Sequence, residues 1–319
     1  MNIADPRTVD RSSWPWTFGV SSPRVRTLDE WRSFARSAEA LGYDIAYVAD
    51  HTMYVDPLLP LVTIAEATDK LRVGTLVLNV GFFHPLLLAR SAATMQLLTN
   101  GRFELGIGGG WAKREHDDLG IEFATPGERV ERVAETLQIV RAALHGDPLG
   151  ATKHYPIAAT SAPPGPLDNP PKLLVGGFGE RLMRSCAAFA DIVQLTGLGD
   201  DRAGALRVVD SGMPAFRQRV DWLRQSAGDR FADIEISLLL QSVVVTANES
   251  ETAEAIERVA KELEVSTEMV ADSPMAVVGT AEQIAAKLQR MRADFGVTHL
   301  CVFAGAMAHF APVIGCLRS

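Results

Sequence analysis

Leu173–Leu195 reads LLVGGFGERLMRSCAAFADIVQL, two apolar runs separated by a glycine-rich turn and a segment of helical period. The runs, Leu173–Val175 and Ile192–Leu195, are short and almost wholly apolar, which is typical of parallel strands covered on both faces. Between them, Arg181–Phe189 carries apolar residues along one helical face. The stretch therefore predicts a strand–helix–strand unit of a parallel α/β fold.

The same alternation continues outward from this unit to both ends of the chain. Further strands are predicted at Thr17–Ser21, Ile45–Ala49, Arg72–Leu78, Phe103–Gly106, Ile236–Val245 and His299–Phe303. Further helices are predicted at Leu28–Leu41, Pro85–Leu98, Arg129–Leu144, Glu251–Leu263 and Ala281–Phe295. A doubly wound open sheet would show the same alternation. About eight strands, and no glycine-rich turn after the first, favour a closed (β/α)8 TIM barrel.

Length and composition favour one soluble, cytoplasmic protein that acts on small molecules. Of the 319 residues, 47% are hydrophobic and 22% charged, and the charges that give the net −8 are interspersed along the chain. No block of Lys and Arg resembles a nucleic-acid footprint, and no apolar run is long enough to span a membrane. The three cysteines are far apart and no signal-peptide core is visible.

We expect residues 1–319 to form a single barrel domain with two insertions at the carboxyl-terminal face. The first, approximately 146–171, is rich in Pro, Gly and Ser, and long irregular segments of this kind are often binding loops. The second, approximately 247–278, adds helix beyond one strand–helix unit. Active sites of such barrels lie where the strands end, so these insertions would border the site.

Asp50 and His51 directly follow the predicted strand Ile45–Ala49. Histidine exchanges protons near neutral pH, and a neighbouring carboxylate fixes its tautomer. The pair is a candidate catalytic unit, with His51 as the proton group and Asp50 orienting it. In the structural alternative, Asp50 only caps the next turn and His51 is a hydrogen-bonded rim histidine.

A glycine-rich turn ends the segment FELGIGGGW (Phe103–Trp111). Gly108 and Gly109 would let the backbone approach a flat ring or a phosphate, and Trp111 would stack on the ring or form a pocket wall. An ordinary turn between a strand and a helix is the alternative.

Gly176 and Gly177 open the predicted helix at Arg181, and free amides at a helix start bind phosphate. Thr196, at the end of the next strand, would add a donor, and Asn79 lies at the same level of the barrel. Either residue is equally suited to form a turn. No His or Cys spacing fits a metal motif, so no metal is expected.

Together these segments resemble the luciferase-like monooxygenase superfamily, whose members are (β/α)8 barrels using FMN or the deazaflavin coenzyme F-420. The chain looks most like the F-420-dependent oxidoreductases, although the FMN branch shares nearly all the motifs. The resemblance runs through VADH (Val48–His51), GTLVLNVGFFHPLLLAR (Gly74–Arg90), TNGRFELGIGGGWAKRE (Thr99–Glu115), GERVERVAETLQIVRAAL (Gly127–Leu144), PPKLLVGGFGERLMR (Pro170–Arg184), ADIVQL (Ala190–Leu195) and VVGTAEQIAAKL (Val277–Leu288).

The resemblance implies a role for each matching position. In sugar-phosphate dehydrogenases of this kind a catalytic glutamate stands where this chain has Trp111, so sugar-phosphate oxidation is not expected. The other matches are Asp50 and His51 beside the reactive ring face, a non-prolyl cis peptide at Leu76-Val77 behind the ring, Asn79 at the pyrimidine edge, Gly176 and Gly177 in the phosphate loop, and Thr196 beside it.

We therefore expect an F-420-dependent oxidoreductase that transfers a hydride between the deazaflavin and a small, apolar or aromatic substrate. The alternatives are an FMN-dependent monooxygenase supplied by a reductase partner, and a non-catalytic flavin-binding barrel. The family tendency implies a homodimer. Substrate contacts are expected from Val20, Ser21, Phe82 and Phe83, and contacts to the polyglutamate tail of F-420 from Lys113, Arg114, Lys153, Arg181 and Arg184.

Overall fold

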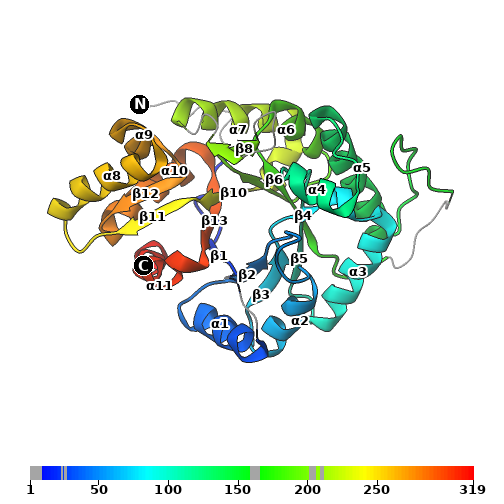
Figure 1. Ribbon diagram of the computed structural model, residues 1–319, viewed down its shortest axis with the longest axis horizontal. Coiled ribbons are helices and arrows are strands. Elements are labelled where there is room, and N and C mark those ends of the chain that lie inside the picture. Colours follow the sequence, from blue (N-terminus) through cyan, green and yellow to red (C-terminus); the bar gives the residue numbers. More distant parts are fainter. Residues whose placement is uncertain (1–8, 23, 25–26, 159–165, 201–205, 209–211) are drawn as a thin grey trace.

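The computed structural model describes residues 9–22, 24, 27–158, 166–200, 206–208 and 212–319. Parallel strands form a closed barrel in the middle of the molecule, and helices surround it (Figure 1). Hydrogen bonding follows the order β3-β2-β1-β13-β10-β7-β6-β5-β4, and pairing of β3 with β5 closes the ring. The predicted TIM barrel is confirmed. The barrel strands are β1 (Thr17–Ser21), β2 (Ile45–Val48), β3 (Arg72–Thr75), β4 (Leu78–Asn79), β5 (Phe103–Gly108), β6 (Lys172–Gly177), β7 (Ile192–Leu195), β10 (Glu235–Leu240) and β13 (Val297–Phe303).

The third strand position of the barrel is interrupted. The sequence predicted one strand over Arg72–Leu78, but the chain forms β3 and then β4, with Leu76 and Val77 between them. The peptide bond between these two residues is cis, as the resemblance implied. Asn79 then pairs with Gly108 of β5, so the ends of two strands lie together at the barrel mouth.

Helices cover the barrel where the apolar periodicity predicted them, and several more occur. Thr280 and Gln283 form the capping box that starts α10, and Thr125 and Glu128 form another at α5. Among the described residues no helix is long and apolar enough to cross a membrane. The helices are α1 (Leu28–Ala40), α2 (Leu59–Glu66), α3 (Pro85–Leu98), α4 (Lys113–Leu119), α5 (Pro126–His145), α6 (Glu180–Cys186), α7 (Met213–Ala227), α8 (Glu249–Leu263), α9 (Thr267–Asp272), α10 (Ala281–Phe295) and α11 (Met307–Arg318), with short 3-10 turns η1 (Val80–Phe82), η2 (Gly228–Asp233) and η3 (Ala304–Ala306).

Inside the barrel, a layer of polar side chains lies next to a layer of apolar side chains. Tyr47, fully buried, donates its hydroxyl to Glu104 and lies 3.2 Å from Nε2 of His299. Arg72 pairs with the same carboxylate at 3.3 Å. Because charged groups are costly to bury singly, these side chains are held as one connected cluster.

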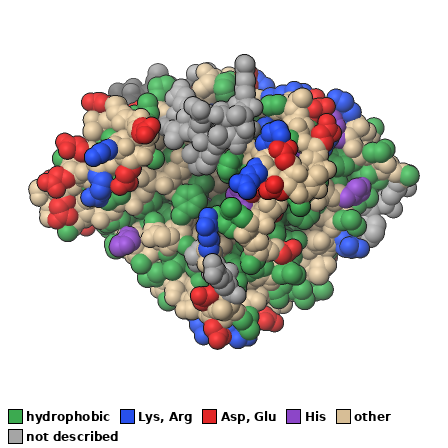
Figure 2. Space-filling view, viewed as in Figure 1, with side chains coloured by type: hydrophobic (Ala, Val, Ile, Leu, Met, Phe, Trp, Pro, Cys, Tyr) green, Lys and Arg blue, Asp and Glu red, His purple; other side chains and the backbone are tan. Residues whose placement is uncertain are grey.

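The second insertion leaves the barrel at the carboxyl end of β10. The predicted strand Ile236–Val245 is in fact two strands, since β10 ends at Leu240 and β11 (Ser242–Val245) pairs with β12 (Ala276–Gly279) in a small separate sheet. In the chain, helices α8 and α9 connect these two strands. The outer helix α8 is rich in glutamate, and acidic side chains gather over it at the left edge of Figure 2.

A short antiparallel pair, β8 (Leu198–Asp200) and β9 (Leu206–Val208), follows β7 and forms a separate two-stranded sheet.

The first insertion lies beside α5 in its described part. Residues 146–171 join the end of α5 to the start of β6, so both ends lie at the amino-terminal side of the strands. The segment returns along the outer side of α5, where the backbone amides of Lys153 and His154 each donate to Glu135 at 2.9 Å. It is the green loop outside α3 and α5 at the right of Figure 1. In its middle the segment reaches the level of the strand ends, because Tyr155 lies 6.1 Å from the ring of His84, the N-cap of α3, between ring centroids. The expectation that this insertion borders the catalytic face stays a prediction.

Candidate active site

Asp50 and His51 follow β2 and point to different partners. Asp50 Oδ2 accepts the backbone N–H of Asn79 at 2.9 Å, which ties the end of β2 to the end of β4. Burial raises the pKa of Asp50 above its ordinary value. Among the described residues, Asp50 makes no hydrogen bond to His51, so the expectation that it orients the imidazole directly is wrong. The hydrogen-bond partner of Asp50 is the backbone of Asn79, whereas that of His51 is a different carboxylate.

The partner of His51 is Glu115 of α4. His51 Nδ1 lies 2.8 Å from Glu115 Oε1, and the two side chains are 26% and 14% exposed. The imidazole also lies between two aromatic rings, edge-on to Tyr54 at 5.4 Å and to Trp111 at 5.8 Å between centroids. An imidazole held on three sides and still open to solvent is suited to proton transfer.

A second contact joins the same elements. His116, the residue after Glu115, is buried and its Nε2 lies 2.9 Å from Asn79 Nδ2. Its Nδ1 lies 3.2 Å from the carbonyl oxygen of Glu122, and burial lowers its pKa. The neutral ring therefore donates from Nδ1 to the carbonyl and accepts the amide hydrogen of Asn79 at Nε2.

The contacts form a closed frame at the barrel mouth. One path runs from His51 to Glu115, and the other from Asp50 through Asn79 to His116. Both paths start at the adjacent residues Asp50 and His51 and end at the adjacent residues Glu115 and His116. A movement of α4 would therefore disturb the hydrogen bonds of both paths. Asn79 Oδ1 also accepts the N–H of Gly81 at 3.0 Å, so its amide retains one hydrogen for the predicted ring contact.

The glycines after β5 make room for neighbours within the protein. A Cβ at Gly108 would lie 2.7 Å from Cγ2 of Val77, and one at Gly176 would lie 3.2 Å from Cγ1 of the same side chain. Gly110 has a φ of +65°, and a Cβ there would lie 2.4 Å from the amide of Asn79. At Gly108 and Gly110 the glycine is thus required by close neighbours within the protein, as expected for an ordinary turn. A Cβ at Gly109 would make only ordinary van der Waals contacts.

The glycine turn after β6 leads into α6. Gly179 is the N-cap of this helix and supplies no side-chain cap, and a Cβ added there would meet nothing within 4 Å. Thr196 donates its N–H to the carbonyl of Gly177 at 3.3 Å, and its hydroxyl accepts from Gln241 at 3.1 Å. The predicted phosphate positions Gly176, Gly177 and Thr196 therefore lie together at adjacent strand ends.

The predicted substrate residues lie in different surroundings. Val20 is fully buried and packs in the core beneath the helices, because strand alternation gives it the opposite face from Gly19, whose Cβ would meet Tyr47 inside the barrel. The assignment of Val20 to the pocket is therefore wrong. Ser21 lies on the same face of the strand as Gly19 and therefore faces the inside of the barrel. Phe82 packs on the ring of His116, and Phe83 packs against the main core.

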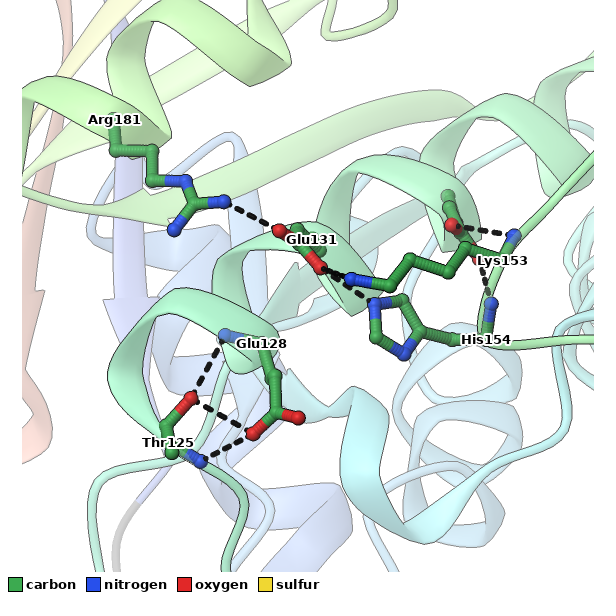
Figure 3. Close-up of polar contacts among 7 residues, drawn as sticks. Thr125, Glu128, Glu131, Lys153, His154 and Arg181 are labelled. Atoms are coloured by element: carbon green, nitrogen blue, oxygen red, sulfur yellow. Dashed lines mark hydrogen bonds and ion pairs between the residues drawn. The ribbon is translucent and has the colours of Figure 1, made fainter.

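All five basic residues proposed for a polyglutamate tail have acidic partners. Figure 3 shows Arg181 of α6 and Lys153 pointing at Glu131 of α5, together with His154. Hydrogen bonds from Lys153 and His154 lower the pKa of Glu131 to about 2. The remaining three pair along their own helices, Lys113 with Asp117, Arg114 with Asp118, and Arg184 with Glu180. These contacts anchor the first insertion and the helices themselves.

Glu115, His116 and Tyr54 are the site residues that the sequence did not single out. Glu115 lies four residues after Trp111, and its distance of 64 residues from His51 gives no sign of the contact. Within the described part of the chain, no group of three His, Cys, Asp or Glu side chains is arranged to hold a metal.

The fold and the arrangement of its strand ends match a known family of barrel proteins. The family model of the luciferase-like monooxygenases matches residues 13–257, and the chain belongs to this family. A 4-hydroxyprotoasukamycin monooxygenase of Streptomyces nodosus subsp. asukaensis is 33% identical over 134 residues, 40% of this chain and 34% of the relative. An F420-dependent glucose-6-phosphate dehydrogenase of Amycolatopsis mediterranei is 34% identical over 119 residues, 34% of this chain and 35% of the relative. The chain thus matches about a third of the length of these relatives.

Solved structures agree on the fold over nearly the whole chain. The coenzyme F420-dependent tetrahydromethanopterin reductase of Methanopyrus kandleri superposes with a TM-score of 0.69 at 16% identity, covering 94% of this chain and 97% of the reductase. The relatives thus include both F420-dependent enzymes and monooxygenases.

Proposed function

We propose that this protein is a coenzyme F-420-dependent oxidoreductase that transfers a hydride between the deazaflavin ring and a small apolar or aromatic substrate. The observation that carries the proposal is the half-buried imidazole of His51 at the end of β2. The end of β2 is directly adjacent to the interrupted strand, because Leu76 donates its N–H to the carbonyl of Val48 at 3.0 Å.

The residues at the mouth fit a flat ring. Leu76 and Val77 are partly buried and pack on the apolar interior cluster of the barrel, and so offer a platform at the level of the strand ends. We assign the ring to this platform, with Asn79 at its polar edge and Trp111 as a wall. The phosphate is assigned to Gly176, Gly177 and Thr196, next to the uncapped start of α6.

The reaction needs one hydride and one proton. Bound F-420 supplies a ring carbon that accepts or gives the hydride. His51 exchanges the proton with the substrate, and the aromatic rings of Tyr54 and Trp111 hold the imidazole in place. Exposed apolar side chains near these strand ends favour a substrate of low polarity, among them Phe303 at the end of β13, which is 44% exposed.

An FMN-dependent monooxygenase, supplied with reduced flavin by a partner reductase, is the second candidate. The ion pairs of Lys113, Arg114, Lys153, Arg181 and Arg184 favour it, because each of the five side chains proposed for a polyglutamate tail already has an acidic partner. Exposed pairs of this kind are worth little and exchange readily, so they do not decide against F-420.

A binding titration separates the two candidates. Purified protein is titrated with F-420 and, separately, with FMN, and binding is followed by the fluorescence of each ring. The proposal predicts micromolar or tighter binding of F-420 and much weaker binding of FMN. Micromolar binding of FMN without binding of F-420 would establish the second candidate instead.

A further inference from the structure

We infer that Glu115 is the positioning residue of His51. Through its contact with Nδ1, the carboxylate keeps the imidazole hydrogen on that nitrogen and presents Nε2 to the barrel mouth as a proton acceptor. The inference rests on the proposed function for the use made of Nε2. The tautomer itself follows from the contact and does not depend on which coenzyme binds.

The chemistry of the two groups determines the tautomer. An ionised carboxylate only accepts hydrogen bonds, so at 2.8 Å from Glu115 Oε1 the Nδ1 atom of His51 must carry the hydrogen. In the neutral ring the lone pair then lies on Nε2. Among the described residues, nothing forms a hydrogen bond with Nε2, and 26% of the side chain is exposed. Within the described chain this nitrogen is therefore not used by a hydrogen bond of the protein itself.

The position of Glu115 is set by the rest of the frame. Glu115 lies in the first turn of α4, where a carboxylate is favourable beside the positive end of the helix. The next residue, His116, is buried and held by Asn79 at 2.9 Å, and Asn79 is held in turn by Asp50. This second path fixes the helix, so that the Glu115 side chain needs little additional ordering to reach His51.

The aromatic contacts limit the remaining freedom of the ring. Tyr54 and Trp111 lie edge-on to the imidazole, with interplanar angles of 85° and 73°. They restrain where the ring lies, but an aromatic edge does not select which nitrogen carries the hydrogen. That selection comes from Glu115.

Nitrogen-15 NMR of the imidazole rings tests the inference directly. The protein is labelled with ¹⁵N-histidine, and the signals of His51 are assigned from their loss in His51→Gln. Spectra are recorded above about pH 8, where an ordinary imidazole is neutral. We expect Nδ1 of His51 to show the shift of a protonated nitrogen, and Nε2 that of an unprotonated one. A hydrogen on Nε2 in the unaltered protein overturns the inference.

Three variants give the comparison. Glu115→Ala removes the acceptor, and we expect the His51 signals to move towards a mixture of tautomers. Glu115→Asp keeps the carboxylate on a shorter side chain and should restore part of the difference. Asp118→Asn removes the same charge from an exposed position of the same helix and should leave the His51 signals unchanged. Unchanged His51 signals in Glu115→Ala would also overturn the inference.

Kinetics then separates positioning from binding. With the coenzyme identified by titration, Glu115→Ala should lower kcat by about 10- to 100-fold, by analogy with the loss when the orienting partner of a metal-bound histidine is removed. The KM and the coenzyme Kd should stay within about twofold, because Glu115 contacts His51 rather than the ring platform. Equal losses in Asp118→Asn would contradict the assignment. If F-420 does not bind, the proposed function fails while the NMR result still decides the role of Glu115.

Discussion

The barrel holds two histidines linked to carboxylates, one at the mouth and one in the interior. His51 lies at the end of β2, contacts Glu115 at 2.8 Å and is partly exposed. His299 of β13 is fully buried, contacts the hydroxyl of Tyr47 at 3.2 Å, and through it reaches Glu104. The residue types are nearly the same in both places, but the depth along the strand differs.

Because of this difference in depth, the histidine at the mouth is suited to proton transfer and the interior histidine has a structural role. Burial lowers the pKa of His299 to about 4, so the interior imidazole is neutral at physiological pH and has no route to a substrate. Its neighbours form a fixed polar layer inside the barrel. At the mouth, the strand has ended and a loop presents the imidazole to solvent. The following predictions test whether the two clusters are as separate as this comparison implies.

Replacing the mouth histidine should have the largest effect. His51→Ala removes the proton group and should lower kcat by about 10²- to 10⁴-fold. Coenzyme affinity and the free energy of unfolding should change little, because the imidazole is partly exposed and does not lie in the core. Steady-state kinetics and urea unfolding measure the two quantities. An activity equal to that of the unaltered protein would exclude His51 as the proton group.

Replacing the interior carboxylate should have the opposite pattern. Glu104→Ala leaves the guanidinium of Arg72 and the hydroxyl of Tyr47 without their shared acceptor, and should lower the free energy of unfolding by about 3–5 kcal/mol. Burial raises the pKa of Glu104. Glu104→Gln keeps an acceptor for Tyr47 and should therefore cost less. Unfolding in urea measures both variants, and coenzyme binding by the folded fraction should be unchanged.

The interior histidine predicts how stability depends on pH. Its folded pKa of about 4 lies below the ordinary value of 6.5, so the unfolded chain binds more protons between these values. Stability should therefore fall as the pH drops from about 6.5 to 4, by about 3 kcal/mol from this group alone. His299→Gln lacks the titration and should show a shallower decline. Equal slopes in the two proteins would mean that His299 does not titrate in this way.

The smallest effect is expected at the outer contact in Figure 3. Glu131→Gln weakens the ion pairs to Lys153 and Arg181, so the first insertion should open more often. Because the described contacts of Glu131 are to Lys153, His154 and Arg181 and not to either histidine cluster, kcat should not change. Hydrogen exchange of the Lys153 and His154 amides should become faster, with a nearly constant melting temperature. Glu122→Gln, an exposed acidic control, should leave this exchange unaltered.

The sequence predicted the fold well because backbone patterns are local. Two-sided apolar strands such as Leu173–Val175 and the capping box at Thr280 depend on residues within a few positions of each other. The pattern did not show that Ile236–Val245 divides into two strands, because the polar residues at the division, Gln241 and Ser242, can also lie within a single strand. It also could not reveal the alternation that turns Val20 away from the mouth.

The site was predicted only in part. Strand ends located Asp50, His51 and the glycine turns, since the barrel topology brings all strand ends to one face. Adjacency in sequence wrongly made Asp50 the partner of His51. The glycines at 108 and 176 were attributed to a ligand, but in the structure they also accommodate the side chain of Val77.

The sequence by itself thus determined the barrel, the strand ends at which chemistry can occur and the histidine placed there. Only the tertiary structure decided which carboxylate meets that histidine. The reason is that strand and helix periods are set by neighbouring residues, whereas the contact between His51 and Glu115 joins loops 64 residues apart. Their approach depends on the register of β4 against β5 and on the position of α4, and both are fixed by packing across the whole barrel.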